Sequence, residues 1–285
     1  MIMDYPQGSV ASPLLAAKRL FLYLCLTLPL LPVQALAVLF KSRLAKDIPL
    51  HYHRLTCRLL GLKVECRGRP ARKHPVLFVC NHVSYWDIIV LGGLLRASFI
   101  AKAEIAGWPF FSWLAKLQRS VFIDRRARLA GSHRDEMLRR FEADDDLILF
   151  PEGTSGDGNR VLPFKSALFA VAEKRPHDRP LTVQPVSIAY TRLDGMPMGR
   201  FWRPHFAWFG DMDLPSHAWE GLGIGRVTVV VEFHPPVTID QFGSRKALAE
   251  HCHREVQSGL VSALTGRPRG RRGAAAARRQ PAAAA

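Results

Sequence analysis

Short apolar runs alternate with amphipathic stretches along most of the chain, and this alternation constrains the fold more than any other feature. The apolar runs cover residues 76–80, 98–101, 121–123, 147–150, 183–188 and 227–231. Such runs, bounded by turn residues, are typical of buried strands. Helical spacing occurs in the stretches 88–95, 109–117, 127–141 and 164–172, and in a last one at 244–264. Strand and helix in repetition predict an α/β fold with a mostly parallel central sheet covered by helices.

A second constraint lies near the N-terminus, where residues 20–40 form 21 positions without a charge. This length is enough to cross a bilayer. However, Pro29 and Pro32 interrupt the middle of the stretch, and basic residues flank both of its ends. Spanning helices usually carry their positive charge on one side. We therefore expect an N-terminal hydrophobic helical membrane anchor, built as helix, break and helix within one leaflet. A kinked single span and a signal peptide are the alternatives.

The charge balance points to anionic partners, since the net charge is +16 and the sequence pI is about 10.3. Six of the arginines lie in the Ala/Gly/Arg/Pro segment 266–285, whose composition predicts a disordered basic tail. The predicted domains are therefore an anchor at 1–46, an α/β domain at 47–265 that opens with a helix near 45–61, and this tail. No nucleic-acid partner is expected, because the chain contains no zinc-finger, RRM or basic-helix signature.

The segment Asn81 to Asp87 directly follows a predicted buried strand and leads into a predicted helix. Loops at the carboxyl ends of strands are where open α/β sheets collect ligands. A turn of this length can return the carboxylate of Asp87 to Nδ1 of His82. The imidazole would then present Nε2 outward as a general base, with the reacting hydroxyl supplied by a substrate. A purely structural pair remains the alternative, because Asp commonly caps helices.

Three further segments follow predicted strands and are expected at the same sheet edge. Arg125 follows the run 121–123 and could attract an anion. The turn 150–156 contains two glycines, which let backbone N–H groups approach a phosphate or an oxyanion. Lys165 comes shortly afterwards, near a predicted helix start. Together the segments place a base, an anion site and a donor loop at successive strand ends.

Four sequence blocks in this order resemble the membrane-associated glycerolipid acyltransferases, typified by bacterial 1-acylglycerol-3-phosphate acyltransferase. The blocks N-H-x-x-x-x-D, F-I-D-R, F-P-E-G-T and V-x-P-V stand at residues 81–87, 122–125, 150–154 and 183–186. An A-K-x-E segment with a later proline also stands at residues 101–109. The resemblance covers the chain from about residue 76 to residue 188, and it also implies an amphiphilic N-terminal helical anchor.

By that resemblance, His82 is the base and Asp87 orients it. The acceptor and its phosphate are expected to contact Lys102, Arg125, Glu152, Gly153 and Thr154, and Pro185 to shape the acyl side. The implied reaction transfers a fatty acyl group from acyl carrier protein or coenzyme A to the free hydroxyl of a lysolipid. It needs no metal and no cofactor beyond this thioester co-substrate. The expected location is the cytoplasmic face of the inner membrane, with the catalytic domain in the cytoplasm.

The sequence departs from the family pattern directly after the E-G-T triplet. Many members have a basic residue there, but this chain has Ser155. The assignment of a phosphate site is weakened by this change. We rank 1-acylglycerol-3-phosphate first as acceptor, with another lysolipid such as lyso-ornithine lipid as the alternative. A non-catalytic basic membrane scaffold is the competing class, whereas a serine hydrolase is disfavoured because no G-x-S-x-G motif is present.

Overall fold

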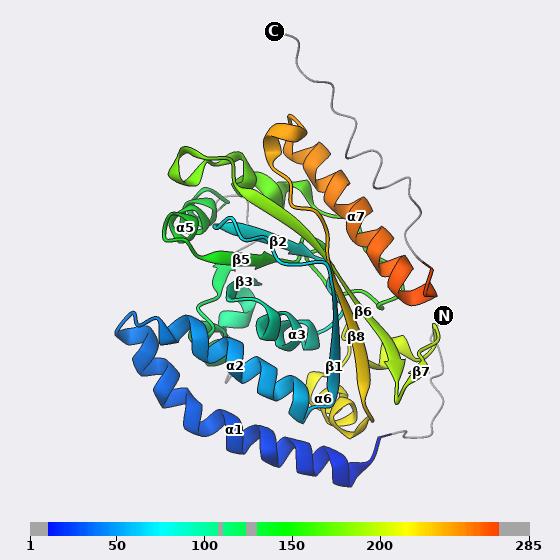
Figure 1. Cartoon of the computed structure of the whole chain (residues 1–285). Helices are drawn as coiled ribbons and strands as arrows, with labels where there is room; N and C mark the ends of the chain where they lie inside the picture. Colours follow the sequence, from blue (N-terminus) through cyan, green and yellow to red (C-terminus); the bar gives the residue numbers. More distant parts are fainter. Residues whose placement is uncertain (1–10, 108–110, 124–129, 268–285) are drawn as a thin grey trace.

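A single sheet of eight strands forms the centre of the molecule, and helices cover both of its faces (Figure 1). The structure is a computed structural model that describes residues 11–107, 111–123 and 130–267. The predicted fold class, an α/β fold with a mostly parallel sheet and an apolar N-terminal helix, is confirmed.

The strand order in the sheet is β1-β8-β6-β2-β5-β3-β4, with β7 paired to β6. The strands are β1 Leu62–Arg67, β2 Val76–Cys80, β3 Ala97–Lys102, β4 Val121–Ile123, β5 Asp146–Leu149, β6 Thr182–Leu193, β7 Met196–Pro197 and β8 Val227–Phe233. Neighbouring strands from β6 through β2, β5 and β3 to β4 are parallel, whereas β8 is antiparallel to β6. The carboxyl ends of the parallel strands β6, β2, β5, β3 and β4 therefore meet at one edge of the sheet.

Seven α-helices and several short 3₁₀ turns connect the strands within the described residues. The helices are α1 Pro13–Leu39, α2 Leu44–Leu59, α3 Trp86–Leu94, α4 Phe111–Leu117, α5 Ala130–Glu142, α6 Leu214–Gly223 and α7 Arg245–Thr265. All six predicted strands are present, as is the linking helix α2. The helix expected at 164–172 is instead the 3₁₀ segment η3 Ser166–Glu173, and the sequence analysis missed β1, β7 and α6.

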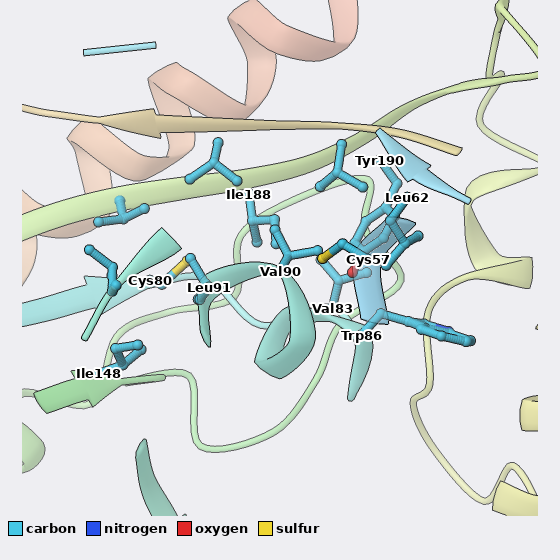
Figure 2. Packing of buried hydrophobic residues seen from close by; sticks show 14 of the residues in the cluster. Cys57, Leu62, Cys80, Val83, Trp86, Val90, Leu91, Ile148, Ile188 and Tyr190 are labelled. Carbon is cyan, nitrogen blue, oxygen red and sulfur yellow. The ribbon is translucent and has the colours of Figure 1, made fainter. Parts of the chain in front are cut away.

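The strands are buried on both faces, which explains why they appear in the sequence as continuous apolar runs. In β2, Phe78 and Cys80 belong to the cluster beneath α2 and α3, whereas Leu77 and Val79 belong to the cluster beneath α5 and α7. This alternation is the two-residue period of a strand. Figure 2 shows the first cluster, where side chains of α3 lie against those of β2 and β6.

Helix α1 continues through Pro29 and Pro32 without interruption. The break predicted at these prolines is therefore wrong, and the chain turns instead at residues 40–43, between α1 and α2. Prolines are tolerated in apolar helices when neighbouring groups satisfy the freed backbone. By length and composition α1 could cross a membrane, with a mean hydropathy of 2.0.

The two sides of α1 differ in an unusual way, because many of its large apolar side chains are exposed, whereas the polar residues Arg19, Thr27 and Gln34 are buried. The exposed apolar residues include Leu14, Phe21, Leu22, Leu28, Val33, Leu36 and Leu39. Arg19 donates to the backbone carbonyls of Leu222, Ile224 and Gly225, at the end of α6. Gln34 donates to the carbonyl oxygens of Ala45 and Leu117, at 3.1 and 2.8 Å. The polar side of α1 therefore docks on the folded domain, and the apolar side is left outward.

Packing of α7 on β6 requires a glycine at position 259. A Cβ there would lie 2.6 Å from Cε1 of His234 and even closer to Oγ of Ser187. Both of these side chains are buried, and they hydrogen bond to each other at 3.2 Å. We predict that Gly259→Ala lowers the free energy of unfolding by about 1–3 kcal/mol, because overpacking displaces this pair.

Urea unfolding in detergent micelles, followed by tryptophan fluorescence, measures the change. Gly199→Ala is the matched control, since a Cβ at that position has no atom within 4 Å. Equal stability of the two variants would contradict the predicted close contact.

Candidate active site

The loop after β2 is held in place by the side chain of Asn81. Its amide donates to the carbonyl oxygen of Ile188 at 3.0 Å and accepts from the N–H of the same residue at 2.9 Å. Asn81 is buried, so both bonds form away from water. These two bonds fix the backbone at the end of β2, directly before His82.

His82 and Asp87 form the predicted pair. Nδ1 of His82 lies 2.9 Å from Oδ2 of Asp87, which stands in the first turn of α3. The Asp87 side chain is fully buried, whereas that of His82 is 22% exposed. With Nδ1 donating to the carboxylate, the neutral form of the ring has its lone pair on Nε2. The imidazole also stacks on Phe150, with the ring centroids 4.1 Å apart.

Three other donors satisfy the buried carboxylate of Asp87. The N–H groups of Val83 and Ser84 donate to Oδ2 at 2.7 and 3.0 Å, and the hydroxyl of Tyr190 donates to Oδ1 at 2.8 Å. Burial, together with the nearby charge of Asp87, raises the pKa of Tyr190 well above its usual range, so this hydroxyl keeps its proton. These three donors hold the carboxyl group of Asp87 in a fixed orientation.

Glu152 connects the backbone of three segments. Its Oε1 accepts from the N–H of His82 at 2.8 Å, and its Oε2 accepts from the N–H of Leu162 at 3.0 Å. The residue is 3% exposed. Burial raises the pKa of Glu152 to about 8, against the opposing effect of the two backbone donors. Through these contacts Glu152 holds the backbone of His82 and of Leu162 to the turn after β5, and its predicted contact with the acceptor stays a prediction.

The glycine turn after β5 uses part of its backbone internally. The N–H of Gly153 donates to Phe150 O at 3.1 Å, and the N–H of Gly156 donates to His82 O at 2.9 Å. These two N–H groups therefore already have protein acceptors, and the approach of backbone N–H groups of this turn to a phosphate or an oxyanion stays a prediction. Gly153 itself adopts a φ of +69°, a backbone conformation that favours glycine.

The remaining predicted site residues lie in different surroundings. Lys102 ends β3 at the same edge, half-buried, and Thr154 is exposed in the turn. Pro185 lies inside β6 opposite Val79, where it is buried and its carbonyl accepts from the N–H of His234 at 3.0 Å. Arg125 lies outside the described residues. The roles of these residues toward a substrate stay predictions.

Tyr190 and Asn81 are the supporting residues whose roles the sequence analysis missed. Tyr190 stands 103 positions from Asp87 in the chain and appears in the sequence only as the polar end of an apolar run. No local pattern reveals its partner. Trp208 donates its backbone N–H to Val83 O at 3.0 Å, and its ring lies beside Tyr85.

The sequence matches the family described as Acyltransferase over residues 63–189, a segment that contains His82, Asp87 and Glu152 but not Tyr190. A lyso-ornithine lipid O-acyltransferase of Brucella abortus is 42% identical over 246 residues, which cover 85% of this chain and 92% of the relative. The chain belongs to the acyltransferase family. It is an O-acyltransferase, as the motif resemblance implied.

Two other relatives define the breadth of this similarity. A 1-acyl-sn-glycerol-3-phosphate acyltransferase of Neisseria gonorrhoeae is 32% identical over 226 residues, which cover 76% of this acyltransferase and 82% of the relative. The crystal structure of the 1-acyl-sn-glycerophosphate acyltransferase from Thermotoga maritima superposes with a TM-score of 0.65 at 21% identity. The match covers 90% of this chain and 96% of the Thermotoga maritima chain, so the two proteins share a fold.

Loss of the Tyr190 hydroxyl should destabilise the acyltransferase. We predict that Tyr190→Phe lowers the free energy of unfolding by about 1.5–3 kcal/mol, because it removes a hydrogen bond to a buried charge. Tyr85→Phe is the control, since its hydroxyl lies 2.9 Å from a neutral acceptor, Nδ1 of His217, and should contribute about 0.5–1.5 kcal/mol. Chemical denaturation measures both values, and a smaller loss for Tyr190→Phe than for Tyr85→Phe would refute the argument.

The carboxyl group of Glu152 should make stability depend on pH. Its pKa is about 8 in the folded protein and about 4.5 when unfolded, so the folded state binds the extra proton between these values. Stability from this group is therefore fully present below pH 4.5 and is lost as the pH rises through 8. We expect the free energy of unfolding to fall less steeply with pH in Glu152→Gln than in the wild type. Identical slopes for the two proteins between pH 5 and pH 8 would show that Glu152 does not titrate in this window.

Proposed function

We propose that this acyltransferase moves a fatty acyl group from acyl carrier protein or coenzyme A to the free hydroxyl of lyso-ornithine lipid. The similarity to the Brucella abortus enzyme, which covers 92% of that relative, is the observation that carries this choice of acceptor. It reverses the order expected from the motifs, which placed 1-acylglycerol-3-phosphate first. The absence of a basic residue directly after Thr154 supports the same choice, because a phosphate acceptor benefits from a cation there.

His82 acts as the general base in this proposal. The hydroxyl oxygen of the acceptor attacks the thioester carbonyl while Nε2 of His82 takes the hydroxyl proton. A new ester C–O bond forms, the C–S bond breaks, and the departing thiolate receives the proton from the imidazolium. Asp87 stabilises the imidazolium through the 2.9 Å bond to Nδ1 and keeps the ring in the productive tautomer.

Acceptor and donor react directly, without an acyl-enzyme. Cys80 is the nearest thiol in sequence, but it is fully buried in the core cluster beneath α3. Burial, with Asp87 and Glu152 nearby, raises the pKa of the Cys80 thiol well above its usual range. A protonated and inaccessible thiol is a poor nucleophile, so Cys80 serves as a core side chain.

The exposed apolar side of α1 supports binding to one leaflet of the membrane that holds the lysolipid. Residues such as Phe21, Leu28 and Leu39 would insert among the acyl chains, while the buried polar side keeps the helix docked on the domain. We place the catalytic domain on the cytoplasmic side of the inner membrane, where acyl thioesters are available. The basic tail, mostly outside the described residues, would contact anionic headgroups there.

An assay with two acceptors tests the proposed function. Purified full-length protein, reconstituted with phospholipid, receives a labelled acyl thioester and either lyso-ornithine lipid or 1-acylglycerol-3-phosphate. We expect kcat/KM to be higher for lyso-ornithine lipid by about tenfold or more, a difference of about 1.4 kcal/mol. His82→Ala should lower the rate by about 10²–10⁴-fold, because a positioned base is lost.

His51→Ala is the matched control for the histidine variant, since His51 is exposed on α2 and should leave the rate unchanged. A preference for 1-acylglycerol-3-phosphate would reject the proposed acceptor but not the reaction. Wild-type activity in His82→Ala would reject the base. A protein that acylates neither lipid would favour the non-catalytic scaffold.

A further inference from the structure

The side chain of Lys165 lies directly across the backbone of Gly153, in the turn that carries the E-G-T triplet. A Cβ added to Gly153 would lie 2.8 Å from Nζ of Lys165 and 3.4 Å from both Cδ and Cε. The ammonium therefore occupies space that any other side chain at position 153 would fill. This places a positive charge in the turn even though no basic residue follows Thr154 directly.

The backbone of Lys165 is fixed to the same turn. Its N–H donates to the carbonyl oxygen of Pro151 at 2.9 Å. Three residues earlier, Leu162 donates to Glu152, whose other oxygen accepts from the N–H of His82. The backbones of Lys165 and His82 are therefore both tied to this turn, the first through Pro151 and the second through Glu152.

The charge of Lys165 is available for a ligand. The residue is exposed, and among the residues that the structure describes it has no ion-pair or side-chain hydrogen-bond partner. Other lysines do have such partners, as Lys46 pairs with Asp145 at 2.6 Å and Lys63 with Glu65 at 3.0 Å. A lysine that lies against a turn without a protein carboxylate is suited to an anion brought by a substrate.

We propose that Lys165 binds the anionic group of the lysolipid acceptor while His82 receives the proton of its hydroxyl. This inference rests on the proposed function and extends it to a headgroup-binding residue. Ornithine has one carboxylate beside its amino groups, and one lysine ammonium can pair with that carboxylate. A phosphate monoester carries about −1.5 to −2 at neutral pH and would need a second cation.

Three lysine variants test the role of Lys165. Lys165→Met keeps the stem that covers Gly153 but removes the charge, and it should raise KM for lyso-ornithine lipid by about tenfold to a hundredfold. Lys165→Arg keeps the charge and should restore most of the affinity. Lys246→Met is the matched control, because Lys246 is exposed on α7, and it should not change KM. The KM for the acyl thioester should be the same in all of these proteins.

Salt provides a readout that a purely structural role would not change. Rising ionic strength should increase the acceptor KM of the wild type, and it should have a smaller effect on Lys165→Met. In addition, Gly153→Ala should raise the acceptor KM by displacing the ammonium. Its effect and that of Lys165→Met should not multiply in the double variant, since both remove one interaction.

The inference is overturned if Lys165→Met keeps the wild-type acceptor KM and its salt dependence, or if Lys246→Met raises KM as much. A wrong choice of acceptor in the proposed function would give a different result. A wild type that prefers 1-acylglycerol-3-phosphate rejects lyso-ornithine lipid as substrate, but a raised KM for that phosphate in Lys165→Met would retain the anion-binding residue.

Discussion

The candidate active site depends on one buried side chain, the carboxylate of Asp87. Taken out of water alone, such a charge would be costly, and its hydrogen bonds to two backbone N–H groups, to Tyr190 and to His82 offset that cost. Three of these donors, the two backbone N–H groups and the Tyr190 hydroxyl, are fixed by the fold. The imidazole of His82 is the fourth donor, and it can bind the remaining side of the carboxylate in only one orientation. The fold of the loop after β2 and the tautomer of His82 are thus consequences of the same electrostatic requirement. The backbone clamp formed by Glu152 gives the loop a second attachment, to the turn after β5.

Different helices cover the two faces of the sheet. This difference affects how substrates could reach the sheet edge that holds His82. Figure 1 shows α1 and α2 on one side of the sheet and α7 on the other. The apolar side of α1 is outward, since polar contacts such as those of Arg19 and Gln34 occupy the inward side. A helix that exposes its apolar side and buries its polar one is unstable in water and stable against lipid. The lipid acceptor would thus approach from the α1 side, and the water-soluble thioester from the side that faces away from the membrane.

Much of the fold could be predicted from the sequence because buried parallel strands leave a strong local signal, as in Val76–Cys80. The pairing of His82 with Asp87 was predictable for the same reason, since five residues separate them. Features that depend on distant contacts were not predictable. Tyr190 reaches Asp87 only because β6 runs past the end of β2. Helix α1 stays continuous at Pro29 because the surrounding packing and solvation, rather than local propensity, decide whether a proline breaks a helix.

The turn after β5 illustrates how a family can change its acceptor while the reaction stays the same. The proposed base and its carboxylate are positioned by β2, α3 and β6, and the segment that follows Thr154 contacts the backbone of His82 through Gly156. In this chain Ser155 uses its hydroxyl to contact the carbonyl oxygen of Trp208, which ties the turn to a neighbouring loop and takes no part in binding a charge. In our proposal the cation comes instead from Lys165, which can lie over the turn because position 153 is glycine. Headgroup binding and proton transfer would then reside on different residues at one edge of the sheet.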